Sequence, residues 1–489
     1  MSKTDSKLGS ESTELSVGLR VLQIALPLEF DGESANNTAS AVAEHNRDRA
    51  SGAATPTGAK STRRGKWYSL YDKVYALANL QQAWLKVRSN KGAPGSDGVT
   101  IKRFEQDLET GLESLHNELC EKRYRPRPVR RKLIPKAGGG MRQLGIPCVR
   151  DRIVQQALLQ ILGPIFESKF SEHSHGFRPG KGCATALQVV DAAVFGSECK
   201  YVVDADICSF FDMVDHEMLL AAVNEEIADG SVLKLIAAFL KSGILLYGVE
   251  EIEANDLGTP QGGPISPLLA NIYLHPLDKA MAEAGFGMVR YADDFVILTS
   301  TREQAEDALA LARETLAGLK LQLHPEKTHV AAVDDGFAFL GYHYFLHRGR
   351  NGNYLQKIVC PKSIKRFRNS IRERTPRHAG QRKPKAKRLT VERLSHNKRV
   401  QKMIRQLNEY IRGWHWYFKS VRTTWDKYFV GFDEFIRRRL RSAITGRLAI
   451  GVWHQRLTIA ALKELGLLSV VDLQEQYERH QLHAPPGSG

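Results

Sequence analysis

The sequence predicts an α+β protein in which a region of mixed helices and strands precedes a basic, helical region. Two stretches have the pattern of strands: residues 201–206 are mostly apolar and run into a turn, and residues 288–298 place apolar β-forming residues on both sides of a polar tip. The third observation is a change of composition after residue 360, where basic residues dominate and a helical region whose aromatic residues supply a core follows.

Length and charge limit what the protein can be. The chain has 489 residues, enough for two to four domains of roughly 100–200 residues each. Its 70 Lys and Arg residues exceed its 54 Asp and Glu residues, so the net charge is +16 and a polyanionic partner is favoured. The six cysteines form no C-x-x-C pair, which indicates free thiols in a reducing compartment. No membrane partner is expected, because no apolar run reaches ~18 residues and no secretory signal is visible.

The first 62 residues are rich in Ser, Ala, Thr and Gly, and we expect a disordered N-terminal extension. Within it, residues 15–26 are apolar enough for a strand or a docking segment, although a tail with a sticky patch explains them equally well. Order is expected to begin near Trp67. Residues 69–86 have helical spacing, residues 91–98 form a turn-rich loop, and residues 309–323 have the apolar spacing of a helix packed on the core.

Acidic residues gather at the ends of the two predicted strands. Asp293 and Asp294 occupy the tip of the hairpin, and Asp204 and Asp206 lie two apart, so both point to one face of their strand. An Asp-Asp pair alone is usually only a turn. The interval between Asp206 and Asp293 leaves room for helices between two neighbouring strands. Together these carboxylates could hold two Mg²⁺ ions about 3.5–4 Å apart.

Three short motifs in a fixed order make the sequence signal specific to one kind of protein. They are D-x-x-x-x-F at Asp206 and Phe211, P-Q-G at residues 260–262, and Y-A-D-D at residues 291–294. This order resembles the palm of reverse transcriptases. The wider string resembles bacterial group II intron-encoded reverse transcriptase/maturases from about residue 70 to about residue 470, on residues 91–99, 133–136, 141–147, 174–182, 258–267, 339–342 and 407–417.

The resemblance implies a right-hand polymerase. It predicts α/β fingers over residues 63–200, a palm with an antiparallel sheet over residues 201–346, and an α-helical thumb or maturase (X) domain over residues 347–489, after the extension of residues 1–62. Two Mg²⁺ ions are expected, for which Mn²⁺ can substitute. The metal ligands implied are Asp206, Asp293 and the Ile207 carbonyl. Asp294 is implied as an assisting residue and is expected to point the other way along its strand.

The remaining implied sites hold nucleotide and nucleic acid. The incoming dNTP would contact Lys136, Arg142, Phe211, Gln261 and Ala292, with Phe211 excluding a 2′-hydroxyl. RNA or primer–template would contact Arg178, Gly341 in a primer-grip hairpin, Arg412, Trp414, Arg437, Arg438 and Arg439. For the basic residues, a solvated helix face is the alternative explanation.

The family resemblance implies RNA-directed DNA synthesis, with intron RNA binding as a splicing maturase and support of retrohoming. The implied partners are an RNA template, a DNA primer, dNTPs, structured intron RNA and a DNA target, in a bacterial cytoplasm near the nucleoid. Because paired cysteines of a C-terminal endonuclease are missing, we expect no second-strand nicking. Two alternatives stay open: an intron-independent enzyme of defence or repair, and an RNA-binding factor whose palm is only a scaffold.

Overall fold

The computed structural model describes residues 65–483, apart from residues 136–140, 197, 246–251, 254, 256, 260–261, 350–351, 377–389, 423–424 and 446–456. The chain divides into two compact units between Ala331 and Ala332, and each is described by itself. The predicted N-terminal extension, with its apolar stretch at residues 15–26, lies outside the described residues.

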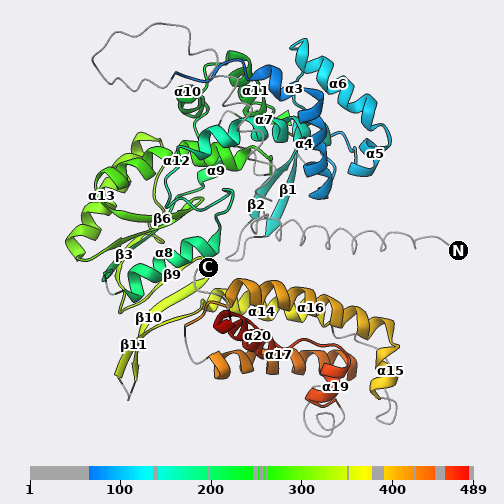
Figure 1. Cartoon of the computed structure of the whole chain (residues 1–489), viewed down its shortest axis with the longest axis vertical. Helices are drawn as coiled ribbons and strands as arrows, with labels where there is room; N and C mark the ends of the chain where they lie inside the picture. Colours follow the sequence, from blue (N-terminus) through cyan, green and yellow to red (C-terminus); the bar gives the residue numbers. More distant parts are fainter. Residues whose placement is uncertain are drawn as a thin grey trace, which may run out of the picture. The chain divides into compact units, whose positions relative to one another are not determined.

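The first unit begins with helices gathered around one long helix. Helix α7 contacts α3, α4 and α6 and is buried on nearly every side, so it forms the centre of this layer (Figure 1). The single helix predicted at residues 69–86 is instead two helices, because Ala76 has a non-helical ψ of 131°. The elements are α3 (Tyr71–Tyr75), α4 (Leu77–Ser89), α5 (Ile101–Gln106), α6 (Leu108–Cys120) and α7 (Val149–Glu167).

A small sheet of order β2-β1-β4-β5 accompanies these helices. Strands β1 and β2 form an antiparallel hairpin in which Pro135 faces Met141, and β4 joins β1 in parallel. The strands are β1 (Val129–Pro135), β2 (Met141–Ile146), β4 (Ile244–Leu245) and β5 (Ile252–Glu253).

A second sheet has the order β6-β7-β3-β8, with β7 antiparallel to both of its neighbours. It confirms the strand predicted at residues 201–206 and the hairpin predicted at residues 288–298. The described part of the connection between β3 and β6 holds four helices, as the long interval allowed. The elements are β3 (Tyr201–Asp206), α9 (Phe210–Met213), α10 (His216–Glu226), α11 (Gly230–Leu240), α12 (Ser266–Glu283), β6 (Gly287–Tyr291), β7 (Asp294–Thr299) and β8 (His329–Ala332).

The alternation of side chains across this sheet separates its core from its acidic residues. Val203 and Ala205 of β3 face Ile297 and Phe295 of β7, and all four belong to the hydrophobic core. Their even-numbered neighbours point to the opposite face. Helices α12 and α13 (Arg302–Gly318) contact the strands, and α8 (Cys183–Phe195) contacts β6 (Figure 1).

The second unit combines a meander of strands with helices. Strands β9, β10 and β11 are antiparallel. The helices bury a cluster of aromatic rings in which Phe367 lies 4.5 Å from Trp414 and 5.1 Å from Phe432, centroid to centroid. The elements are β9 (Phe337–Phe339), β10 (Tyr342–Gly349), β11 (Gly352–Val359), α14 (Pro361–Arg374), α15 (Val391–Ser395), α16 (Lys398–Phe418), α17 (Trp425–Thr445), α19 (Ile459–Glu464) and α20 (Val470–His483).

Among the described helices, none combines the length and the apolar character that a membrane span requires.

The aromatic cluster generates a stability prediction. Phe367→Ala removes a ring with no exposed surface and leaves a cavity between α14, α16 and α17. Its free energy of unfolding in urea is expected to fall by about 3–5 kcal/mol. The nearby Lys365→Ala, on the exposed side of α14, is expected to change it by less than about 0.5 kcal/mol. Equal losses for the two variants would contradict this packing.

Candidate active site

Three aspartates meet at one end of the β3–β7 pair. Asp206, the last residue of β3, faces Asp294, the first residue of β7, and Asp293 precedes it in the turn after β6. Residues that face each other across an antiparallel ladder point to the same face and have Cβ atoms roughly 4.5–5.5 Å apart. Asp294, expected to point the other way along its strand and only to assist, is placed beside Asp206 by this register.

The carboxylates form a region short of positive charge. Burial, and then Asp204, Asp293 and Asp206, raise the pKa of Asp294 to about 8. Lys327 donates to the carboxylate of Asp206, and its charge acts in the opposite direction on Asp294. Where neighbouring acids raise the pKa of a carboxyl group, a bound cation stabilises the deprotonated carboxylates. We call Asp204, Asp206, Asp293 and Asp294 the carboxylate edge.

The carboxylate edge fits divalent metal ions that share ligands with a substrate. Among the described residues, no three His, Cys, Asp or Glu side chains stand as a ready-made metal cage. Mg²⁺ does not need one, because it keeps waters and takes oxygens from substrate phosphates beside one or two carboxylates. The bridge between Ile207 and Leu323 uses the carbonyl of Asp206 and the amide of Cys208. The carbonyl of Ile207, the predicted metal ligand, takes no part in these two hydrogen bonds.

A buried arginine fixes the turn that carries Asp293. Arg290 has no exposed surface, and its guanidinium donates to Asp278 of α12 at 2.5 and 2.7 Å. The same group donates to Asn271 at 3.1 Å and to the Ala292 carbonyl at 2.9 Å. Ala292 adopts a positive φ of 59°, so the hydrogen bond to its carbonyl stabilises a conformation that a non-glycine residue rarely takes.

The segment before α8 closes on the same turn. His175 donates its amide to the Arg290 carbonyl at 2.8 Å, and Asn271 donates to the Gly176 carbonyl at 2.8 Å. A Cβ on Gly176 would collide with the amide of Ala292, so only glycine allows this approach. Ala292, predicted to contact nucleotide, is itself buried against this segment.

Phe211 lies at the start of α9, half-buried, with its ring 5.1 Å from that of Phe210. Thr259 donates its amide to the Phe211 carbonyl at 2.8 Å. Gly258, at φ 84°, approaches so closely that a Cβ would lie 2.7 Å from the same carbonyl oxygen. The segment that leads to residues 260–261 is therefore held against the backbone of Phe211 by a hydrogen bond and a close backbone approach. Gln261 itself lies outside the described residues.

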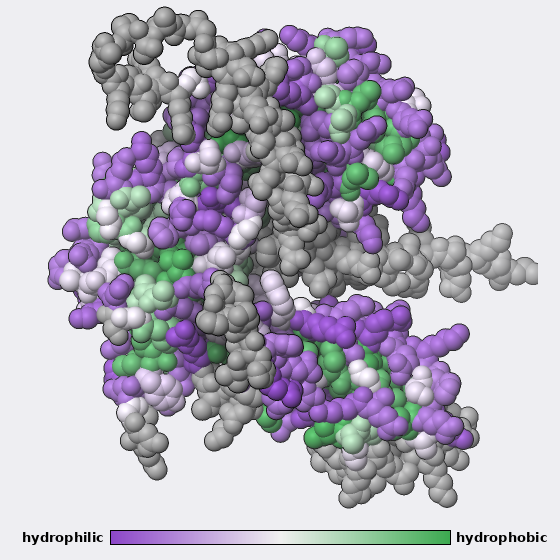
Figure 2. Space-filling view, in the orientation of Figure 1, coloured by the Kyte–Doolittle hydropathy of each residue, from purple (hydrophilic) through white to green (hydrophobic). Residues whose placement is uncertain are grey.

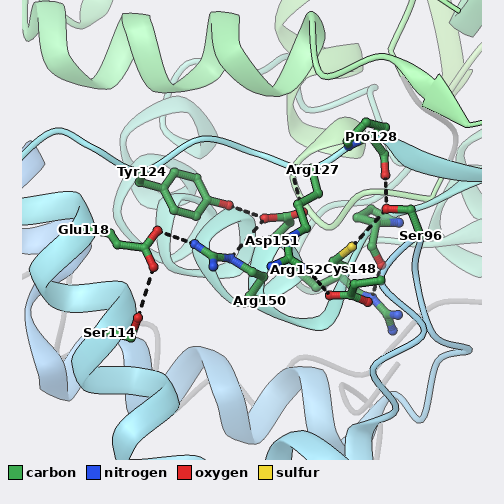
Figure 3. A network of polar contacts seen from close by, with 12 residues as sticks. Ser96, Ser114, Glu118, Tyr124, Arg127, Pro128, Cys148, Arg150, Asp151 and Arg152 are labelled. Carbon is green, nitrogen blue, oxygen red and sulfur yellow. Dashed lines mark hydrogen bonds and ion pairs between the residues drawn. The ribbon is translucent and has the colours of Figure 1, made fainter. Parts of the chain in front are cut away.

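Of the two predicted phosphate-binding cations, Lys136 lies outside the described residues, and only the backbone of Arg142 is described. Arg142 pairs with Ile134 in the β1–β2 hairpin. A polar network anchors the base of this hairpin (Figure 3). In it, Asp151 accepts from the Tyr124 hydroxyl at 2.5 Å and from the Arg127 amide at 3.1 Å.

The same network holds the predicted loop of residues 91–98. Ser96 donates to the Pro128 carbonyl at 2.6 Å, immediately before β1 (Figure 3). A Cβ on Gly95 would lie 2.5 Å from the backbone of Cys148, so this glycine allows the loop to lie against the start of α7. Loop, hairpin and helix α7 are thus one connected framework.

Arg178 does not present its charge to a nucleic acid. Its side chain is buried and pairs with Glu167 at 2.7 Å, donates to the Ser174 carbonyl at 2.7 Å, and stacks over Phe170 at 5.4 Å. The predicted contact with template or nucleotide is therefore corrected: the guanidinium joins α7 to the loop that closes on Ala292.

In the second unit, the predicted nucleic-acid residues separate into exposed and buried ones. Arg412 and Arg438 are exposed. Gly341 lies in the turn between β9 and β10 with a φ of 80°, and a Cβ added to it would lie 3.5 Å from the Phe418 ring. Trp414 belongs to the aromatic core, which corrects its prediction as an RNA contact.

The arginine run of residues 437–439 cannot act as one surface, because successive helical residues point in different directions. Arg437 pairs with Asp433 at 3.7 Å and is only 15% exposed. Arg439 donates to the Thr375 carbonyl at 2.9 Å. Arg438 alone of the three is exposed.

Comparison with known proteins gives consistent matches. Residues 134–344 match the reverse transcriptase (RNA-dependent DNA polymerase) family, and residues 383–448 match the group II intron maturase-specific domain. The chain is 36% identical over 316 residues to protein YkfC of Escherichia coli, covering 56% of this chain and 82% of that one. It is 40% identical over 213 residues to the group II intron-encoded protein LtrA of Lactococcus lactis, covering 43% of this chain and 34% of that one. One solved structure, a partial Cas6-RT-Cas1--Cas2 complex, is 24% identical with a TM-score of 0.34, over 55% of this chain and 44% of that one.

The buried ion pair predicts two separable effects. Arg290→Met leaves Asp278 buried without its partner and is expected to lower the free energy of unfolding by about 3–5 kcal/mol. The double variant Arg290→Met/Asp278→Leu is expected to recover most of that stability in urea titrations. It still lacks the donor to the Ala292 carbonyl, so its Mn²⁺ affinity should stay below wild type. Full recovery of metal affinity in the double variant would show that Arg290 has no positioning role.

The raised pKa of Asp294 predicts how stability depends on pH. Without metal, the folded protein keeps this proton up to about pH 8, while the unfolded chain releases it near its ordinary value. The contribution is therefore lost as pH rises through about 8, and the melting temperature should fall between pH 7 and 8.5. In that window Asp151, with a pKa of about 6, and His175, with a pKa of about 4, have already titrated.

Two comparisons check this dependence. Asp294→Asn should flatten the fall in melting temperature, and Mg²⁺ should stabilise the wild type more at pH 8.5 than at pH 7, because metal binding releases the proton. An unchanged slope in Asp294→Asn would assign the pH dependence to another group.

Proposed function

This chain belongs to the family of group II intron-encoded reverse transcriptases and maturases, and we propose that its carboxylate edge extends a DNA primer on an RNA template. It is an RNA-directed DNA polymerase of α+β fold. Enzymes of this family use divalent metal ions, and we propose two Mg²⁺ ions, with Mn²⁺ as a substitute.

The observation that carries this proposal is the register of β3 and β7. It brings Asp206 and Asp294 face to face beside the turn that carries Asp293. The ligands are hard carboxylate oxygens, which suit Mg²⁺. Bound there, the metal ions would lower the pKa of a primer 3′-hydroxyl and neutralise charge on the departing pyrophosphate. The protein's own part is to hold the three carboxylates in place and to bring nucleotide and primer to them. The β3–β7 register places Asp206 and Asp294, and Arg290 fixes the turn that carries Asp293.

Nucleotide selection would depend on Phe211. Its attachment to Gly258 and Thr259 supports the role of a ring beneath the sugar, because both contacts fix the backbone from which the ring projects. We propose that Gln261 contacts the sugar and that Lys136 and Arg142 bind the triphosphate from the β1–β2 hairpin.

The partners include nucleic acids, because both family matches are to nucleic-acid-processing domains. We propose that the second unit binds structured intron RNA as a splicing maturase, and that the protein supports retrohoming into a DNA target in the bacterial cytoplasm near the nucleoid. The match of residues 383–448 to the maturase-specific domain favours this role over intron-independent defence or repair.

Primer extension tests the polymerase proposal. With an RNA template, a DNA primer, dNTPs and Mg²⁺, Asp206→Ala and Asp293→Ala are expected to lower the rate by at least about a hundredfold, because each loses several kcal/mol of metal-dependent stabilisation. The matched control is Asp307→Ala, an exposed acid on α13, which should extend the primer at the wild-type rate. A folded wild type that makes no cDNA would falsify the proposal.

The same assay tests Phe211. Replacing its ring by Ala is expected to raise incorporation of ribonucleotides relative to deoxyribonucleotides, since a 2′-hydroxyl would no longer meet the ring. The measurement is the ratio of kcat/KM for one rNTP and its dNTP. Phe210→Leu, at the fully buried neighbouring ring, is the control for general damage to α9. If both variants leave the ratio unchanged, Phe211 does not select the sugar.

A further inference from the structure

The solvent face of α16 is a basic stripe that ends in an exposed tryptophan. Residues on this face recur at alternating intervals of four and three, so they line one side of a helix of 21 residues, roughly 30 Å long. The opposite side faces the core through Val400, Ile404, Leu407, Ile411 and Trp414. The basic stripe consists of the exposed residues Lys398, Lys402, Arg405, Arg412 and Trp416, with Glu409 as the acidic member.

Within the described part of the chain, no ion pair neutralises the cations in the middle of the basic stripe. Among the residues the structure describes, Lys402, Arg405 and Arg412 form no ion pair. The surface over α14 and α16 is hydrophilic in the view of Figure 2. Charges that repel one another along a helix are suited to a polyanion that runs beside it.

Trp416 differs from the other aromatic residues of this helix. It is 52% exposed, whereas Trp414, two residues earlier, is 7% exposed in the core. Beside it, a Cβ on the exposed Gly413 would meet nothing within 4 Å, so that side of the helix is open. On the other side, the ammonium group of Lys419 lies 5.5 Å from the Trp416 ring and 4.7 Å from the ring of Tyr477.

Buried hydrogen bonds hold this corner in place. The His415 ring pairs with the side chain of Gln474 at 2.9 Å, and Gln474 donates to the Lys419 carbonyl at 3.2 Å. Both residues are buried, and they join the end of α16 to α20. The residues on either side of this pair, including Trp416 and Lys419, therefore have a fixed backbone, which lowers the entropy cost of placing a ligand against them.

We propose that Trp416 stacks on an unpaired base of an RNA whose backbone lies along the basic stripe. This rests on the proposed RNA binding of the second unit. The cations supply contacts to phosphate without regard to sequence, while an exposed ring supplies a flat surface for one base. A base within a duplex has both faces covered, so the stripe prefers RNA in which a paired stem meets a single-stranded tail.

The first test measures binding of the full chain to three RNA probes by fluorescence anisotropy. The probes are a blunt hairpin, the same hairpin with a single-stranded tail, and the tailed hairpin with abasic nucleotides in the tail. Trp416→Ala is expected to weaken binding of the tailed hairpin roughly 5- to 150-fold, the loss typical of one stacked base. Binding of the blunt and abasic probes should be unchanged, and Trp416→Phe should restore most of the affinity.

Two further variants separate stacking from charge and from folding. Arg405→Ala should weaken binding to all three probes and reduce the salt dependence of binding by about one ion. Trp416→Ala should leave that salt dependence unchanged. Gly413→Leu places a side chain in the open space beside Trp416. It should raise the melting temperature, because leucine favours a helix over glycine, and still weaken the tailed probe.

The possible results distinguish a failure of the stacking inference from a failure of the proposed RNA binding. If Trp416→Ala binds the tailed hairpin as tightly as wild type, or loses all three probes equally, the stacking inference is wrong while RNA binding stands. If the wild type binds no probe, or Arg405→Ala has no effect on any of them, the proposed RNA binding by this face fails and the stacking inference falls with it.

Discussion

The position of Asp293 at the carboxylate edge depends on the buried ion pair between Arg290 and Asp278. Burying two charges is costly unless every hydrogen bond is made, and here the guanidinium also satisfies Asn271 and the Ala292 carbonyl. One side chain therefore connects the helix α12, the strand β6 and the turn of Asp293. Through Asn271 and Gly176 the same network reaches the segment before α8. The sheet supplies the register, and this network fixes the turn.

Much of the fold could be predicted from local sequence patterns. The strand at residues 201–206 and the hairpin around Asp293 follow from apolar residues flanking polar tips, and the structure has both. Helix α13 is as predicted at Leu309, Ala312 and Leu316, but it ends at Gly318, so Leu319 and Leu323 of the predicted helix lie beyond it. The break at Ala76 could not be predicted, because alanine favours helices, whereas Ala76 has a non-helical ψ of 131°.

The site was less predictable where it depends on contacts between distant residues. Lys327 contacts Asp206 across 121 positions, and nothing local to either residue signals it. The inward turn of Arg178 and the burial of Trp414 were missed because a motif gives a residue's identity but not the face it occupies. The direction of Asp294 depends on its pairing with Asp206 in a distant strand, which the motif around it does not reveal.

The alternation along β3 has a consequence for insertions and deletions. Val203 and Ala205 face the core, whereas Asp204 and Asp206 belong to the carboxylate edge on the other face. The loss of one residue within the strand would exchange the two sets. Carboxylates would then enter the core while alanine and valine replaced them at the edge. The helical connection between β3 and β6 carries no such period of two, and its surface turns can change length. Sequence drift in this protein should therefore accumulate as length changes between the strands and as substitutions within them.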